Sequence, residues 1–421
     1  MADSTRPASQ AELAASRLTL LSVFLRDLYL LFLALLVVER TTSSDFLFQW
    51  MRWYVMIGTT ILAIKGISSG FFPTLFPSFR DLSLADRTPA PSRPTGPKLA
   101  KSTRSGRSPE DGGLSFEYAV SEMQGWRESM EDCTVSLPRL SAPFDKTAMF
   151  CVFDGHGGST VSKMCSLRFP DELIKQSHGK SFENQLDDIL TDMYAATDSA
   201  IFELGSVGGS GPPAESPEGQ KIERKNLFDF TGCTAVTVLM LPKTADDQIG
   251  RVAVANAGDS RAILCRGGLA VELSHDHKPE SPRERSRIEK AGGKVTAIGP
   301  CFRVDWGLNL SRSLGDFAYK RNELLPPSEQ KISSLPDLVH ETLTSNDQFI
   351  VVACDGLFEL LTSQEVVDFV RSGLSRGLPL DKIAENLLDE CCAKDPSVTL
   401  GRGTDNETCI LVRFLSSNNI T

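Results

Sequence analysis

The chain has 421 residues, 41% hydrophobic and 23% charged, so it is long enough for a large core and for more than one domain or appendage. Its formal net charge of −10 argues against a general nucleic-acid-binding protein, because such proteins present an excess of positive charge. The ten cysteines include no C-x-x-C pair and several lie in apolar runs. This pattern predicts small core residues in a reducing compartment, not a disulfide framework.

The N-terminal region, residues 1–83, contains two apolar stretches at 18–38 and 46–67, each about one bilayer crossing of ~20 residues. Charged residues interrupt both stretches, and a charge near the centre of a span costs roughly 2.5–3.5 kcal/mol. Basic residues precede the first stretch and follow the second, which predicts a membrane hairpin with both ends in the cytosol. The alternative is a pair of amphipathic helices that pack on the protein or lie on a membrane surface. Without a true span, the protein would be soluble in the cytosol or nucleus.

Residues 84–115 are rich in Pro, Ser, Arg and Gly and contain few large apolar side chains. Such a composition cannot bury a core, so we expect a disordered linker here. The globular domain is therefore predicted to begin near Phe116 and to extend to about residue 415.

Within this domain, short apolar runs alternate with segments of helical periodicity, which favours a layered arrangement of strands and helices over an all-β barrel. Capping boxes at Ser281–Glu284 and Thr362–Glu365 predict two of the helix starts. The strands are expected at 116–121, 133–137, 147–153, 234–241, 251–256, 262–265, 349–354 and 408–414, and the helices at 181–204, 281–292, 362–370 and 381–392. Residues 205–220 are expected to form a surface loop.

Aspartates recur where apolar strands begin or end. Asp154-Gly155 and Asp355-Gly356 follow buried strands, and Asp405-Asn406 precedes one. Each alone is more often a turn or helix-capping residue than a ligand. Carboxylates gathered at one sheet edge would repel one another, and a divalent cation is the usual remedy. An oxygen-only ligand set favours Mg²⁺ or Mn²⁺ over Zn²⁺.

Two further side chains suit chemistry at a phosphate. His156 follows Asp154 closely, and its ordinary pKa near ~6.5 suits a proton donor better than a ligand among carboxylates. Arg127 could hold a phosphate through two parallel hydrogen bonds. The alternative for Arg127 is a surface ion pair with Glu131, which would contribute little.

Nine motifs in order make the segment from about 116 to 415 resemble the metal-dependent PPM family, the type 2C protein serine/threonine phosphatases. They are R-E-S-M-E-D (127–132), D-G-H-G-G (154–158), T-G-C-T-A-V (231–236), A-N-A-G-D-S-R (255–261), L-S-H-D-H-K-P (273–279), R-I-E-K-A-G-G (287–293), L-S-R-S-L-G-D (310–316), V-A-C-D-G-L-F (352–358) and D-N-E-T (405–408). Nothing in residues 1–115 matches the family core.

The resemblance implies an α+β fold, a four-layer α/β/β/α sandwich with two central antiparallel sheets, preceded here by the hydrophobic N-terminal region. It also implies two Mg²⁺ or Mn²⁺ ions, with Asp154 bridging both and Arg127 holding the substrate phosphate. His156 would protonate the leaving group, and water would attack phosphorus without a covalent phosphoenzyme. The candidate metal ligands are Glu131, Asp132, Asp154, the Gly155 carbonyl, Asp259, Asp316, Asp355 and Asp405, of which Asp259 would serve a weaker third ion.

Two positions depart from the family pattern. The family often has Asp four residues after the Asp355 position, and this chain has Glu359 there, which weakens the case for a third ion. The usual Gly-Ser-Thr segment is Gly232-Cys233-Thr234. Residues 275–300 resemble the flap that is thought to influence substrate choice.

The expected partners are phosphoprotein substrates and, through the N-terminal region, a membrane. We expect no nucleic-acid partner, and we expect the catalytic domain to be monomeric. The alternatives are a membrane-tethered pseudophosphatase that serves as a binding or scaffold protein, and a phosphatase for small molecules.

Overall fold

The computed structural model describes residues 96–415 except 110–113, 143, 145, 183, 208–225 and 243–249. These residues belong to the second of two units into which the chain divides, Pro94–Thr421. Both predicted membrane stretches, 18–38 and 46–67, lie outside the described residues, as does most of the expected loop at 205–220. Within the part of the chain that is described, no helix has both the length and the apolar character needed to cross a membrane.

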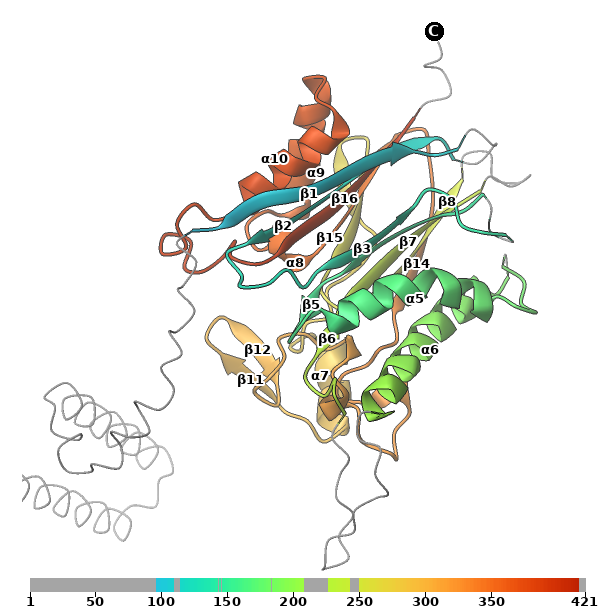
Figure 1. Cartoon of the computed structure of the whole chain (residues 1–421), viewed down its shortest axis with the longest axis vertical. Coiled ribbons are helices and arrows are strands. Elements are labelled where there is room, and N and C mark those ends of the chain that lie inside the picture. The colour runs from blue at the N-terminus through green and yellow to red at the C-terminus, as the bar shows by residue number, and fades with distance from the viewer. Residues whose placement is uncertain are drawn as a thin grey trace, which may run out of the picture. The chain divides into compact units, whose positions relative to one another are not determined.

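Two antiparallel sheets form the centre of the domain, and they lie face to face in Figure 1. The six-stranded sheet has the order β1 (Lys98–Arg107), β2 (Phe116–Gly125), β16 (Glu407–Phe414), β15 (Asp347–Ala353), β9 (Arg261–Arg266) and β10 (Leu269–Glu272). The five-stranded sheet has the order β14 (Asp337–Thr342), β8 (Arg251–Ala257), β7 (Ala235–Leu241), β4 (Ala148–Phe153) and β3 (Cys133–Leu137). The predicted α+β class with antiparallel sheets is confirmed.

The apolar side chains of β4 pack on both faces of its sheet. Because successive side chains of a strand point to opposite faces, Phe150 and Val152 enter the core between the two sheets. Met149 and Phe153 enter the core beneath the helices on the other side. All six residues of this strand are buried, which explains why the sequence shows an unbroken apolar run.

Helices cover the outer face of each sheet (Figure 1). Helices α5 (Thr160–Gln176) and α6 (Leu186–Val207) pack on the five-stranded sheet, and α9 (Ser363–Ser375) and α10 (Leu380–Cys391) on the six-stranded sheet. Helix α6 begins at Leu186, five residues later than the periodicity predicted. The capping box at Thr362 is confirmed, with the Glu365 amide donating to its hydroxyl. Helix α5 was not predicted, and it contains Pro170 and has a polar composition.

The prediction of a disordered linker over 84–115 is wrong for residues 98–107, which form strand β1 and pair with β2 along its whole length. The composition gave no signal, because this edge strand is mostly exposed and needs no alternating apolar residues. Polar contacts fix it instead: Arg104 meets Glu122, and Lys101 lies 2.6 Å from Asp389 on α10.

Short elements lie at the end of the domain where β4 and β15 finish. A three-stranded sheet joins β13 (Leu314–Gly315), β6 (Gly232–Cys233) and β5 (Gly155–His156), and α8 (Asp355–Phe358) follows β15. Helix α7 (Pro282–Lys290) precedes the hairpin of β11 (Val295–Ile298) and β12 (Cys301–Val304), which lies at the same end as β5 and β6 (Figure 1). Two 3-10 turns, η1 (Phe317–Tyr319) and η2 (Pro327–Glu329), complete the described elements.

The predicted capping box at Ser281 is wrong. Helix α7 does begin with Pro282, but the Ser281 side chain makes no capping hydrogen bond. Glu284 accepts hydrogen bonds from Arg312 and Arg287 instead. Buried guanidinium groups offer a carboxylate charge-assisted hydrogen bonds, which outcompete a backbone amide.

Candidate active site

The strand-end aspartates meet at one end of the two sheets. Asp154 follows β4, Asp355 follows β15 at the start of α8, and Asp405 lies two residues before β16. The antiparallel pairing of β15 with β16 brings the last two together, since the Cys354 amide donates to the Thr408 carbonyl at 3.2 Å. The Glu131 amide donates to the Asn406 side chain at 2.9 Å, which joins the 127–132 segment to the same end.

The electrostatics of this end show how closely the carboxylates approach. Burial raises the pKa of Asp154 well above its usual value, and the negative charges of Asp132, Asp355, Asp405 and Asp259 raise it further. Asp154 nevertheless keeps part of its surface accessible to solvent. These carboxylates disfavour one another's ionisation, and the site faces solvent. A divalent cation would stabilise their charged forms.

Asp132 also favours a cation at this end. It is buried, and neither of its carboxylate oxygens has a hydrogen bond of good geometry among the described residues, although the Thr408 hydroxyl and the Cys354 thiol lie close enough to lower its pKa. Burial, together with the negative charge of Asp405, raises the pKa of Asp132 to about 7. Buried carboxylate oxygens without partners are rare in folded proteins and call for an ion or water. The residues at this end therefore fit a bound cation.

The carboxylates converge without closing into a complete cage. Across the described ranges, no group of three or more His, Cys, Asp or Glu side chains is placed to hold one ion unaided.

Two glycines let the aspartate-bearing segments approach their neighbours. A Cβ atom at Gly155 would overlap the Glu131 carbonyl oxygen, and one at Gly356 would overlap the Asn406 carbonyl oxygen. Neither glycine has a positive φ. Glycine is therefore needed at both positions for the close approach of a neighbouring backbone, not for a left-handed conformation.

Arg127 and Glu131 do not pair with each other. The Arg127 guanidinium donates to Asp405 at 2.5 Å, and its side chain is 58% exposed. Glu131 instead accepts hydrogen bonds from the Ser129 hydroxyl at 2.6 Å and the Gly158 amide at 3.0 Å. Arg127 thus lies at the mouth of the site, with one carboxylate partner and most of its surface open.

His156 and Asp316 form a hydrogen-bonded pair at the same end of the domain. The His156 Nε2 lies 2.7 Å from the Asp316 Oδ2, and the Ser313 hydroxyl donates to the same oxygen at 2.6 Å. The sequence predicted Asp316 as a metal ligand; its Oδ2 contacts the imidazole and the Ser313 hydroxyl, and its buried Oδ1 has no hydrogen-bond partner among the described residues. Burial lowers the pKa of His156, but the charge and hydrogen bond of Asp316 outweigh this, so the pKa is raised overall.

Asp259 is held by a lysine that the sequence reasoning did not assign. Asp259 is only 2% exposed and its carboxylate pairs with the Lys278 ammonium group. Lys278 also faces Asp355, where its charge opposes the rise in the carboxyl pKa. The only available signal was its place in the L-S-H-D-H-K-P motif. Glu359, at the position where the family often has Asp, accepts a hydrogen bond from the Gly403 amide at 2.6 Å.

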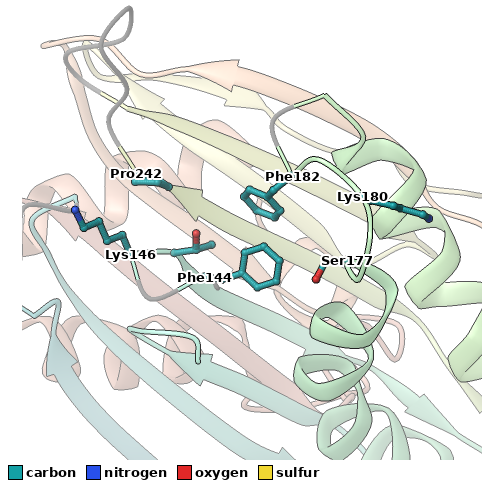
Figure 2. A pocket seen from close by; sticks show the side chains of 7 residues that line it. Phe144, Lys146, Ser177, Lys180, Phe182 and Pro242 are labelled. Carbon is teal, nitrogen blue, oxygen red and sulfur yellow. The ribbon is translucent and has the colours of Figure 1, made fainter. Parts of the chain in front are cut away.

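A surface pocket of about 460 Å³ lies at the other end of the five-stranded sheet, near the start of β4 and the end of β7 (Figure 2). None of the predicted site residues lines it; its walls are Phe144, Lys146, Thr147, Ser177, Lys180, Phe182 and Pro242.

Comparison with known proteins agrees with this geometry. The family model described as Protein phosphatase 2C matches residues 116–397. The chain is 39% identical over 319 residues to "Probable protein phosphatase 2C 5" of Paramecium tetraurelia, covering 76% of this chain and 97% of that protein. It is 38% identical over 322 residues to "Protein phosphatase 2C homolog 2" of Schizosaccharomyces pombe, covering 76% and 77% of the two chains.

The fold is also similar to solved structures. A crystal structure of a phosphatase from a pathogenic strain of Toxoplasma gondii matches with a TM-score of 0.56 and 24% identity, covering 74% of this chain and 96% of that one. At this identity the match supports the fold alone. The sequence relatives, which span most of both chains, support the family. The chain therefore belongs to the protein phosphatase 2C family and is a protein phosphatase.

Proposed function

We propose that the protein hydrolyses phosphoserine and phosphothreonine in proteins with the help of two divalent cations, Mg²⁺ or Mn²⁺. The observation that carries this proposal is the convergence of Asp154, Asp355 and Asp405, with the buried Asp132 beside them. Burial and then the neighbouring negative charges raise the pKa of Asp154, and bound cations would offset that repulsion.

The ligand set that we propose is the one that the family resemblance implies. Asp154 and the Gly155 carbonyl would be shared or adjacent ligands, Asp355 and Asp405 would complete one ion, and Glu131 would reach its ion directly or through water. The cations, when bound, supply charge neutralisation and a water molecule acidic enough to attack phosphorus. A weaker third ion at Asp259 would have to compete with Lys278.

Arg127 binds and orients the substrate phosphate. Its guanidinium is exposed at the mouth and already meets a carboxylate oxygen of Asp405. A phosphate offers the same kind of acceptor in pairs, so the planar guanidinium would bind it bidentately. In phosphoryl transfer the charge lies on the equatorial oxygens, where a fixed cation stabilises the transition state.

His156 carries the proton for the departing serine or threonine oxygen. Its Nε2 is engaged by Asp316, so Nδ1 is the nitrogen free to face the leaving group. The raised pKa of the imidazole favours its protonated form near neutral pH. General acid catalysis of this kind contributes roughly 10²–10⁴-fold.

The test uses the full-length protein and a phosphothreonine peptide. We expect turnover that requires Mn²⁺ or Mg²⁺, is abolished by EDTA, and is lost in Asp154→Ala. Asp368→Ala, an exposed aspartate on α9, serves as the control and should keep full activity. Activity that ignores EDTA, or full activity in Asp154→Ala, would refute the two-cation mechanism. Phosphopeptide binding without turnover would support the pseudophosphatase alternative. A strong preference for small phosphate esters would support the alternative of a phosphatase for small molecules.

We also propose that the N-terminal region attaches the protein to a membrane, with the catalytic domain in the cytosol. The support is the length and flanking charge of stretches 18–38 and 46–67 in the sequence. Full-length protein should sediment with membranes and resist carbonate extraction. Release by high salt would indicate surface binding, and recovery in the soluble fraction would contradict attachment.

A further inference from the structure

Two large apolar side chains are exposed on segments at the end of the domain that carries β5 and His156 (Figure 1). Phe230 is 69% exposed and Trp306 is 68% exposed. Single exposed apolar residues are common on proteins and need no explanation. The Phe230 ring contacts Tyr319, whose hydroxyl lies against Gly307, the residue after Trp306; we call the side chains of Phe230, Tyr319 and Trp306 the aromatic platform.

Phe230 is fixed relative to His156 through the backbone. The Phe230 carbonyl packs so closely on Gly157 that a Cβ atom there would overlap it. The next residue, Thr231, donates from its hydroxyl to the Gly157 carbonyl at 3.0 Å and accepts the Asp316 amide at 3.0 Å. Phe230 therefore directly precedes Thr231, which is hydrogen-bonded both to Gly157, next to His156, and to Asp316.

Tyr319 connects Phe230 to the hairpin β11–β12. The rings of Phe230 and Tyr319 meet edge to face, with centroids 6.3 Å apart and planes at 89°. On the other side, the Tyr319 hydroxyl occupies the space that a Cβ atom on Gly307 would need, and Gly307 is the residue after Trp306. Figure 1 shows the hairpin at the end of the domain that carries β5 and β6.

The turn that presents Trp306 is strained and held in place. Asp305 and Trp306 both have positive φ, at 46° and 70°, although neither is glycine. Such conformations cost of order 1–3 kcal/mol and persist only where surrounding contacts enforce them. Asp305 accepts the Lys294 amide at 2.8 Å and pairs with Lys331 at 2.8 Å. An exposed tryptophan on an enforced turn suits a binding role better than a packing role.

We propose that the aromatic platform binds an apolar side chain of the substrate, close in sequence to the phosphorylated residue. This inference rests on the proposed function, which places the phosphate at Arg127 and the leaving oxygen at His156. Since an extended peptide advances about 3.3–3.6 Å per residue, we expect the contacting residue within about three positions of the phosphorylated one. The charges of the turn are already engaged, Asp305 by Lys331 and Arg303 by the Gly307 carbonyl. The platform therefore selects for apolar character.

The experiment compares phosphothreonine peptides that differ only by Leu or Ser at one flanking position, scanned from three residues before to three residues after the phosphorylated site. With full-length protein and Mn²⁺, we expect kcat/KM to favour Leu by about tenfold at one or two positions. Phe230→Ala and Trp306→Ala should bring this ratio close to one, whereas Phe230→Leu should keep most of it. Because the ratio is taken within each variant, a loss of folded protein cancels.

Leu269→Ala is the matched control, because Leu269 is 68% exposed on β10 and should leave the Leu/Ser ratio unchanged. A ratio near one at every position, or a ratio that survives Phe230→Ala, would overturn the inference while leaving metal-dependent phosphatase activity intact. Loss of all metal-dependent turnover in the unsubstituted protein would overturn the proposed function and the inference with it. A change in oligomeric state in Phe230→Ala, with the ratio unchanged, would show that the platform is a self-contact instead.

Discussion

The Asp316 carboxylate accepts a hydrogen bond from the His156 ring at 2.7 Å, across 160 residues of sequence. Asp316 is fully buried, its backbone is left-handed with φ of 51°, and its second carboxylate oxygen has no hydrogen-bond partner. The buried carboxylate thus fixes the orientation of a half-buried imidazole and favours its protonated form.

Asp316→Asn should therefore change the pH dependence of the reaction. The Asp316 charge raises the pKa of His156 against the opposing effect of burial. A general acid is active when protonated, so the rate falls as pH rises through its pKa. Removing the charge lowers that pKa, and the alkaline fall in kcat should begin at a lower pH. At pH 8 we expect kcat to drop at least about tenfold. The measurement is a kcat profile from pH 5.5 to 9; an unshifted alkaline limb would contradict this role.

Asp154→Asn should stabilise the metal-free protein while destroying its activity. The folded protein holds the Asp154 carboxylate among four other negative charges, so a neutral amide removes repulsion. The melting temperature in EDTA should rise by about 2–4 °C for each kcal/mol of repulsion relieved. Mn²⁺-dependent turnover should fall roughly a hundredfold or more, because a cation supplies several kcal/mol of transition-state stabilisation. Scanning calorimetry with EDTA and with Mn²⁺ tests both; a lower melting temperature in EDTA would show that the carboxylate is stabilising.

Glu284→Gln should destabilise the domain in a pH-dependent way. Burial would raise the pKa of Glu284, but hydrogen bonds and charge from Arg312 and Arg287 lower it to about 2. A depressed carboxyl pKa gives stability that is present above the ordinary value of 4.5 and is lost as pH falls toward 2. Breaking a buried pair leaves guanidinium charge uncompensated, so we expect a loss of roughly 3 kcal/mol at pH 7. Urea unfolding at several pH values measures this; equal losses at pH 7 and pH 2.5 would contradict it.

Gly232→Ala should impair catalysis through Asp316 without weakening cation binding. A Cβ atom at Gly232 would overlap the Asp316 carboxylate, which would have to move away from His156. We expect kcat to fall at least about tenfold, with the Mn²⁺ concentration for half-activity unchanged. Gly96→Ala is the control, since no atom lies within 4 Å of its added Cβ. A raised Mn²⁺ requirement in Gly232→Ala would mean that the substitution disturbs the carboxylates instead.

The local sequence pattern was enough to predict the helices and strands whose signals lie within a few residues of one another. The apolar run ending at Asp154 identified β4 because every residue of that strand is buried, and Thr362 with Glu365 marked the start of α9. The Asp-Gly pairs that follow these apolar runs identified Asp154 and Asp355 as candidate site residues. Capping residues and strand alternation act within a few positions, so the sequence by itself determined these features.

Only the tertiary structure decided which charged groups meet. Arg127 pairs with Asp405 across 278 residues, and Lys278 holds Asp259. Strand β1 exists because β2 offers it hydrogen-bonding partners, although its own residues show no strand pattern. Such contacts depend on how the sheets bring distant segments together, and the energy of an ion pair or a strand edge depends on the partner and its burial. No local pattern carries that information.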